Sequence, residues 1–341
     1  MIKRMQGTDG IRGPICFSDD SQSSDPMTAF LNEGVLTEEF FELYTFAYCK
    51  ELIETHFASE DDTAVIGWDP RDFSGIFYDA AVSGIRKAGL TAVSVDILPT
   101  PAISLYQLQT RAACGFVLTA SHNPANQNGI KIFLGYSNLK LFPEDDKRLT
   151  QRCLDINFDD VKNAPLIGEF KNEHIAAKNL FKEFMYDKEN HWMVGDTLGG
   201  TTIIIDLANG AFSPLMGDLL KFDSGNFLIT NSNPSNGINL YSGVADLEGF
   251  DSISASEIEI GCFSKYETLN LLLKEGRKQK EKLTNCSNLV LGFVFDGDGD
   301  RCFILSYDPF EDRVIVLNGD VSAFFQAKFL KRKNLLSKDP L

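Results

Sequence analysis

The sequence contains no C-x-x-C pair, and its seven cysteines are scattered along 341 residues. An odd count with this spacing predicts neither a disulfide framework nor a zinc ribbon, so we expect reduced thiols. It also contains no run of 18 apolar residues, and no apolar run follows the basic residues near the N-terminus. We therefore expect no membrane span and no signal peptide, and a cytoplasmic location.

Basic residues are in deficit: 32 lysines and arginines stand against 48 aspartates and glutamates, a formal net charge of −16. Nucleic acids and anionic membranes are bound by basic surfaces, so we expect neither as a partner. A small anionic substrate remains compatible, because it needs only a few local cations. Apolar residues make up 43% and charged residues 23%, which is typical of a globular protein of two to three domains.

Strand-like apolar runs alternate with segments of helical spacing along the chain, which predicts an α/β fold. The first unit has strands at 63–67, 91–97 and 114–119, with helices at 75–88 and 102–108 between them. The pattern then restarts twice. The second unit has helices at 173–186, 214–222 and 266–274 and strands at 201–206 and 227–230, and the third has strands at 289–295, 302–307 and 314–317 and a helix at 321–330.

We therefore expect consecutive related α/β domains with mixed, largely parallel sheets flanked by helices. The predicted domains are residues 1–165, 172–284 and 286–341. The third is short for an independent α/β domain, which usually needs about 100 residues.

The strongest local signal is Asp296-Gly297-Asp298-Gly299-Asp300-Arg301, directly after an apolar strand. Three carboxylates at alternate positions can converge, and they repel one another unless a cation lies among them. Oxygen ligands favour Mg²⁺ or Ca²⁺. The EF-hand pattern fails, because its sixth position would be Arg301 and its twelfth Tyr307. A divalent-metal site open to a phosphate fits better than a solvated acidic turn.

The second signal is Thr119-Ala120-Ser121-His122-Asn123-Pro124, after another predicted strand. Loops at the carboxyl ends of strands carry the ligands of α/β proteins, so Ser121 could be a nucleophile or carry a phosphate. His122 is its neighbour in sequence, which does not suit a Ser-His pair, and no G-x-S-x-G is present. Taken alone, a serine in a turn is more often structural.

Two further segments are weak on their own. The glycine-rich run 7–13, with its single arginine Arg12, suits an anion site but equally a plain N-terminal turn. Asn128-Gly129-Ile130-Lys131 places one lysine near the proposed serine, where it could be a base, a phosphate contact or simply a surface lysine.

Together, in order and spacing, these four segments resemble the α-D-phosphohexomutase superfamily. Residues 119–124 are similar to its phosphoserine loop, 296–301 to its metal loop, 7–13 to its N-terminal signature, and 128–131 to the segment with its catalytic lysine. Shorter matches lie at 67–71, 99–102 and 203–211. Within the superfamily, segments 7–13, 140–141, 236–239 and 318–320 are most similar to bacterial phosphoglucosamine mutases.

The resemblance implies an enzyme that interconverts hexose 6-phosphate and hexose 1-phosphate through a phosphoserine and a hexose 1,6-bisphosphate. It implies glucosamine phosphate as substrate, with a phosphoglucomutase or phosphomannomutase as the alternative. It also implies that Mg²⁺ and the ammonium-bearing Lys131 lie close together, which would lower the pKa of that lysine as a base requires. The implied residues are Ser121 (phosphorylated), Lys131 and Arg12 in catalysis; Ser121, Asp296, Asp298 and Asp300 on Mg²⁺; and Thr8, Asp9, Gly10, His122, Asn123 and Arg301 on the substrate.

The chain departs from the superfamily after the metal loop. The superfamily has four domains, and neither its sugar-specificity loop nor its later phosphate-gripping loop is found here, so we expect an incomplete third domain and no fourth. Three interpretations stay open: a mutase whose remainder lies elsewhere, for example on a second chain; a non-catalytic relic that binds phosphosugar or metal; or a short mutase completed by forming a homodimer.

Overall fold

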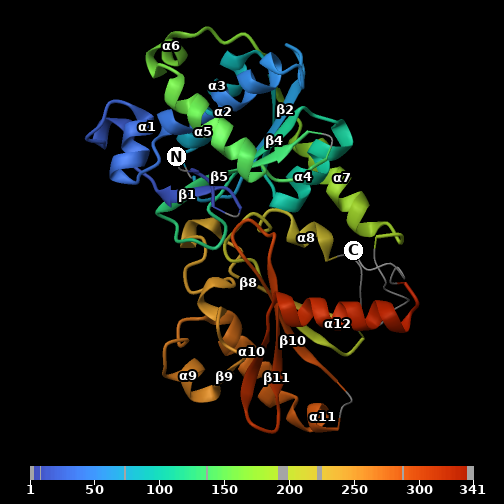
Figure 1. Cartoon of the computed structure of the whole chain (residues 1–341). Coiled ribbons are helices and arrows are strands. Elements are labelled where there is room, and N and C mark those ends of the chain that lie inside the picture. The colour runs from blue at the N-terminus through green and yellow to red at the C-terminus, as the bar shows by residue number, and fades with distance from the viewer. Residues whose placement is uncertain are drawn as a thin grey trace.

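The computed structural model describes residues 4–7, 9–72, 74–135, 137–190, 199–220, 225–285 and 288–335. They form two lobes, each built on one six-stranded sheet (Figure 1). The α/β class with mixed sheets is confirmed.

The sheet of the first lobe has the spatial order β1-β5-β4-β2-β3-β6. Neighbouring strands β4, β2, β3 and β6 run parallel, while β5 is antiparallel to both β1 and β4. The carboxyl ends of β2, β3 and β4 therefore meet at one edge, where the loops that follow them can meet a ligand. The strands are β1 (Ile11–Pro14), β2 (Thr63–Trp68), β3 (Thr91–Ile97), β4 (Cys114–Leu118), β5 (Gln127–Leu134) and β6 (Phe170–Asn172).

Helices cover both faces of this sheet. Three of them, α2 (Glu38–Glu54), α3 (Ile76–Ala88) and α5 (Pro143–Asp155), pack with α6 (Phe158–Asn163) in one apolar cluster that includes Ala64 and Phe116 of the sheet. The short α1 (Pro26–Thr28) lies beside α2. Helix α3 ends where its sequence predicts, because Gly89 adopts φ +111°, a conformation that L side chains rarely take.

The sheet of the second lobe has the order β8-β7-β10-β11-β12-β9. Strand β7 is parallel to β8 and β10, and the other neighbours are antiparallel. Strands from the expected second and third units thus share one sheet, so the expected joint at 284–286 does not separate two sheets. Strand β10 joins the antiparallel strands β11 and β12 to β7. The strands are β7 (Thr202–Asp206), β8 (Asn226–Thr230), β9 (Ser252–Ser254), β10 (Val290–Phe295), β11 (Cys302–Asp308) and β12 (Arg313–Leu317).

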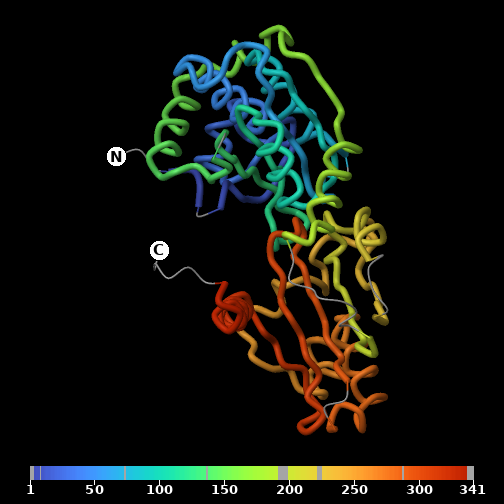
Figure 2. Tube along the Cα trace, turned by 90° about the vertical axis from the view of Figure 1, so that its right-hand side faces the viewer, coloured from blue at the N-terminus to red at the C-terminus, as the bar shows by residue number. Residues whose placement is uncertain are grey.

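The helices of this lobe follow the expectation in part. Helix α8 (Met216–Leu219) is shorter than the predicted 214–222, of which residues 221 and 222 lie outside the described residues. Helix α12 (Gly319–Arg332) forms as predicted but buries none of its residues; it lies against β11 and β12, to one side of the sheet (Figure 2). The others are α9 (Ala255–Glu259), α10 (Glu267–Lys278), whose leucines fill the core on the other face, and α11 (Lys280–Thr284).

A continuous apolar cluster joins the lobes. It combines α4 (Thr100–Thr110) and α7 (His174–Tyr186) with residues of both sheets, such as Val117 of β4 and Ile205 of β7. This contact fixes the loop after β4 opposite the loop after β10. Among the described residues, no helix is long and apolar enough to cross a bilayer.

Candidate active site

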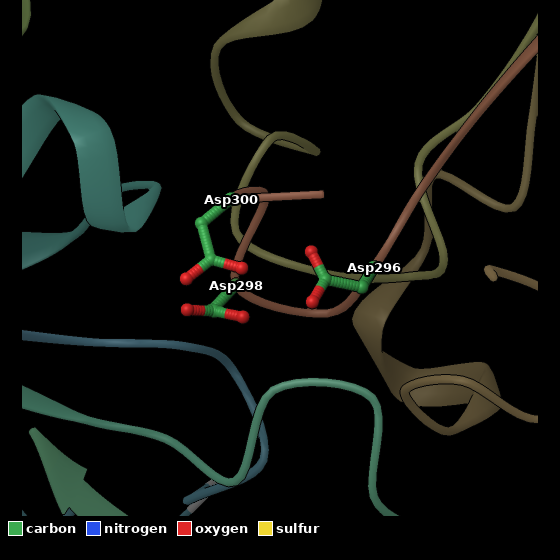
Figure 3. Close-up of side chains that lie close together, drawn as sticks. All are labelled: Asp296, Asp298 and Asp300. Atoms are coloured by element: carbon green, nitrogen blue, oxygen red, sulfur yellow. The ribbon is translucent and has the colours of Figure 1, made fainter. Parts of the chain in front are cut away.

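The loop between β10 and β11 holds three carboxylates that face one another where the lobes meet (Figure 3). One oxygen from each of Asp296, Asp298 and Asp300 lies within 4.8 Å of the others. Asp296 and Asp298 are buried, and Asp300 is more open to solvent. Gly299 lets the loop turn this sharply, because its φ of +73° is strained for any L side chain.

Lys131 of β5 supplies a positive charge to this cluster. Its Nζ lies 2.6 Å from Asp298 Oδ2 and 2.6 Å from Asp300 Oδ2, and the side chain is 1% exposed. Burial lowers the pKa of Lys131, but the two carboxylates outweigh it and the net pKa is raised. The two carboxylates therefore stabilise the ammonium. The expected lowering refers to a site that holds Mg²⁺, and it stays a prediction.

Ser121, in the loop after β4, reaches the cluster from the first lobe. Its Oγ donates a hydrogen bond of 2.6 Å to Asp296 Oδ2, and the residue is fully buried. Its φ is +53°, in the left-handed region that costs a non-glycine residue about 1–2 kcal/mol. The hydroxyl, the carboxylates and the ammonium therefore lie within one buried site.

The electrostatics of the carboxylates show that the cluster is short of positive charge. Burial, together with the charges of Asp298 and Asp300, raises the pKa of Asp296 to about 8. Burial also acts to raise the pKa of Asp298, but the charge and hydrogen bond of Lys131 prevail and lower it to about 2. Asp298 Oδ1 is buried without a hydrogen-bond partner among the described residues. An unpaired buried oxygen amid oxygen-only donors fits a hard cation such as Mg²⁺.

Asp9, in the loop before β1, lies beside this cluster and contacts three cationic side chains. Its Oδ2 lies 2.7 Å from Arg12 Nη2 and 3.0 Å from Lys131 Nζ, and its Oδ1 pairs with Lys140. A Cβ on Gly10 would come within 2.5 Å of a main-chain oxygen of β5, so this position requires glycine. Thr8 lies outside the described residues.

The predicted substrate residues of the serine loop point in two directions. His122 Nδ1 lies 2.8 Å from Arg301 Nη1, which also lies 3.1 Å from Glu248 Oε1. Burial, followed by the charge of Arg301, lowers the pKa of His122. The Asn123 side chain instead donates to Gln127 Oε1 within its own loop, at 2.7 Å. The structure therefore brings His122 and Arg301 together at the rim and turns the amide of Asn123 away.

Comparisons with known proteins decide the family. Residues 3–160 match the family model described as phosphoglucomutase/phosphomannomutase, alpha/beta/alpha domain I. Phosphoglucosamine mutases of Clostridium acetobutylicum and Syntrophus aciditrophicus are each 28% identical over 98% of this chain. These matches place residues 3–160 in the α-D-phosphohexomutase superfamily, and the chain as a whole is similar to members of it. The chain spans 62% of the length of each of these two relatives of the superfamily.

Solved structures show the same phosphohexomutase fold. A putative phosphomannomutase from Thermus thermophilus superposes with a TM-score of 0.63 at 17% identity, over 98% of this chain and 63% of that one. A phosphoglucomutase/phosphomannomutase family protein from Burkholderia thailandensis gives 0.59 at 19% identity, over 97% and 59%.

Several residues of this candidate site were not predicted as functional. Thr100 starts α4, donates its hydroxyl to Asp298 Oδ2, and donates its N–H to the Asp298 carbonyl at 2.8 Å. Asn239 and Lys140 also approach the site, and both lie in segments whose resemblance was noted without a role. Asp69 and Arg71 directly follow β2 at the edge where ligands bind, which is the sequence signal that could have identified them.

Proposed function

We propose that this chain carries the phosphoryl-transfer half of a phosphohexomutase, with Ser121 as the residue that is phosphorylated. The proposal rests on the 2.6 Å hydrogen bond from Ser121 Oγ to Asp296, a member of the carboxylate cluster that Lys131 contacts. Similarity to the superfamily supports the reaction class, and the similarity to phosphoglucosamine mutases supports glucosamine phosphate as the substrate.

The transfer follows from the residues that converge. The bond between phosphorus and Ser121 Oγ breaks as a bond forms to a sugar hydroxyl, giving hexose 1,6-bisphosphate, and the hydroxyl proton is passed on to Oγ. Lys131, which is an ammonium, would donate a proton to Oγ and take up the proton of the sugar hydroxyl, and Arg12 would contact the phosphate. In the second transfer the other phosphate returns to Ser121, and the proton moves back to the sugar oxygen.

Asp296, Asp298, Asp300 and the phosphorylated Ser121 would hold Mg²⁺. When bound, the ion supplies positive charge against the phosphoryl oxygens, which lowers the barrier to their transfer. Arg12, Lys140 and Arg301 add cationic side chains around the same site, which suits an anionic sugar despite the net charge of −16.

The test measures phosphate transfer and turnover separately on the 341-residue chain. Hexose 1,6-bisphosphate and Mg²⁺ are added, and intact mass reports phosphate on Ser121. The 6-phosphates of glucosamine, glucose, mannose and N-acetylglucosamine are then tested for turnover. We expect labelling that Ser121→Ala abolishes and that Ser235→Ala, at an exposed serine, retains.

Turnover of glucosamine phosphate alone would support the full proposal, and turnover of glucose or mannose phosphate would replace its substrate. Labelling without turnover of any sugar would limit the activity of this chain to the half-reaction. A folded chain that takes up no phosphate would contradict the proposal and favour a non-catalytic phosphosugar- or metal-binding protein.

A further inference from the structure

We propose that Asp69, Arg71 and Thr119 are positioning residues that hold the backbone of Ser121 from both sides and thereby aim its hydroxyl. The inference rests on the proposed function, because it concerns the serine proposed to be phosphorylated. The anchoring of the loop backbone can still be measured in a chain that shows no turnover.

The carbonyl side of Ser121 is held by Arg71. The Arg71 Nη2 atom donates to the Ser121 carbonyl oxygen at 2.6 Å, and its Nη1 donates to the Gln127 carbonyl at 2.9 Å, on the far side of the same loop. Its Nε lies 2.8 and 2.9 Å from the two carboxylate oxygens of Asp69. Both charged side chains are fully buried. The planar guanidinium thus spans the loop at fixed angles, which a lysine could not do.

The amide side of Ser121 is held by Thr119. The N–H of Ser121 donates to Thr119 Oγ1 at 2.7 Å, and the Thr119 hydroxyl donates its only hydrogen to Asp69 Oδ2. The direction of both bonds is fixed, because a carboxylate only accepts and a backbone N–H only donates. Asp69 therefore anchors both sides, through Arg71 and through Thr119.

This anchoring explains how Ser121 keeps an unfavourable conformation. Its φ of +53° is sparsely populated for a serine, and such residues persist only where their surroundings over-determine them. If one anchor is lost, the peptide can relax toward ordinary φ values, and Oγ then leaves its position 2.6 Å from Asp296 Oδ2. Errors of about 1 Å in the placement of a reacting atom can slow a reaction about 100-fold.

A buried ion pair and a buried threonine can also serve stability alone, and the two roles predict different responses at Thr119. Valine has the shape of threonine without the hydroxyl, whereas serine keeps the hydroxyl without the methyl group. If the Thr119 side chain serves only packing, Thr119→Ser should have the larger effect. If its hydroxyl positions Ser121, Thr119→Val should have the larger effect. Thr45→Val is the matched control, because Thr45 is equally buried in the first lobe and its hydroxyl bonds, among the described residues, only carbonyls of α2 and α3.

The experiment measures two quantities on the full chain and these three variants. The first is the rate at which hexose 1,6-bisphosphate phosphorylates Ser121 with Mg²⁺ present, followed by intact mass. The second is hydrogen–deuterium exchange of the peptide covering residues 118–128. Melting temperatures show how far each variant is destabilised.

We expect Thr119→Val to slow labelling about 100-fold and to speed exchange in this peptide, while Thr119→Ser restores most of both. Thr45→Val should lose melting temperature without these changes. Unchanged labelling and exchange in Thr119→Val, or a larger effect of Thr119→Ser, would overturn the inference.

A wild-type chain that takes up no phosphate would count against the proposed function. Hydrogen–deuterium exchange alone would then test the anchoring of the loop. Faster exchange in Thr119→Val but not in Thr119→Ser supports the anchoring, and equal exchange overturns it. If Thr119→Val does not fold, Arg71→Lys, which keeps the charge beside Asp69 and loses the fork, is measured in the same way.

Discussion

The side-chain amide of Asn239, in the second lobe, donates to the carbonyl oxygen of Ser121, in the first lobe, at 2.8 Å. The same amide lies 3.1 Å from the Asn123 carbonyl. Thr100 makes the reciprocal contact from the first lobe to Asp298 in the second. Each lobe therefore holds the reactive loop of the other.

Removing this amide should weaken the contact between the lobes. Asn239→Gly deletes the donor yet keeps a residue that tolerates its φ of +58°. We expect a loss of about 1 kcal/mol in unfolding free energy, the usual net contribution of one hydrogen bond, measured by urea denaturation. Asn236→Gly, at an exposed asparagine nearby, is the control. Equal losses in the two variants would mean that the contact contributes nothing specific.

Magnesium should stabilise the chain through the three carboxylates. A cation that binds only the folded state raises the melting temperature with concentration, and Asp298 contributes the buried oxygen that has no other partner among the described residues. We expect Asp298→Asn to reduce the Mg²⁺-dependent rise by about half or more, measured by calorimetry. Asp251→Asn, at an exposed aspartate of the same lobe, should retain it. An unchanged rise in Asp298→Asn would place the ion elsewhere.

Lys131→Met should destabilise the chain strongly when no divalent ion is present. It leaves Asp298 buried without its cation, and breaking a buried pair costs about 3–5 kcal/mol. Mg²⁺ should recover part of this loss, because the ion takes over the role of neutralising the carboxylates. Urea denaturation with and without Mg²⁺ measures both effects. Lys147→Met, which removes an exposed pair with Glu144, should cost less than about 1 kcal/mol.

Were the loss in Lys131→Met the same with and without Mg²⁺, the lysine and the ion would not share these carboxylates. If Lys131→Met lost no more unfolding free energy than Lys147→Met, the three carboxylates would not need a neighbouring cation for the chain to stay folded.

Asp206, at the end of β7, should make stability depend on pH. Burial raises its pKa from 3.8 to about 6, against hydrogen bonds that include one of 2.6 Å from Thr268. Between these pH values the folded chain keeps a proton that the unfolded chain loses. The stabilisation is therefore complete below pH 3.8 and is lost as pH rises through 6, by about 3 kcal/mol.

Asp206→Asn removes this titration. We expect the unfolding free energy of the variant, relative to wild type, to increase by about 2 kcal/mol between pH 4 and pH 7, measured by urea denaturation at both pH values. Asp19→Asn, at an exposed aspartate, is the control. A constant difference between Asp206→Asn and wild type would mean that Asp206 is ionised throughout this range.

The elements that depend on local sequence were predictable. The apolar spacing of 75–88 and its terminal glycine predict α3 within one residue, because helix periodicity and end signals are local. Ser121 and the three aspartates were found because each follows a strand within a short motif. These side chains lie close together because the two loops that carry them face each other in the fold that the motifs indicated.

Relationships between distant segments were less accessible. Strands β7 and β10 pair although more than 80 residues separate them, so the sequence pattern alone divided one sheet into two units. The prediction for the pKa of Lys131 considered Mg²⁺ and left out the carboxylates, which raise this pKa. Its direction depends on how many carboxylates surround the ammonium in space, and Asp298 and Asp300 are 167 and 169 residues away.

The 175 residues between Ser121 and Asp296 also set an order of events during synthesis. A ribosome adding about 5–20 residues per second takes roughly 10–35 s to make the acidic loop after the serine loop. Throughout that interval the nascent first lobe carries its serine without carboxylates to anchor a cation beside it. Because the hydroxyl and the carboxylates of the proposed site are made at separate times, an unfinished chain cannot assemble this site, and its residues meet only when the second lobe has docked.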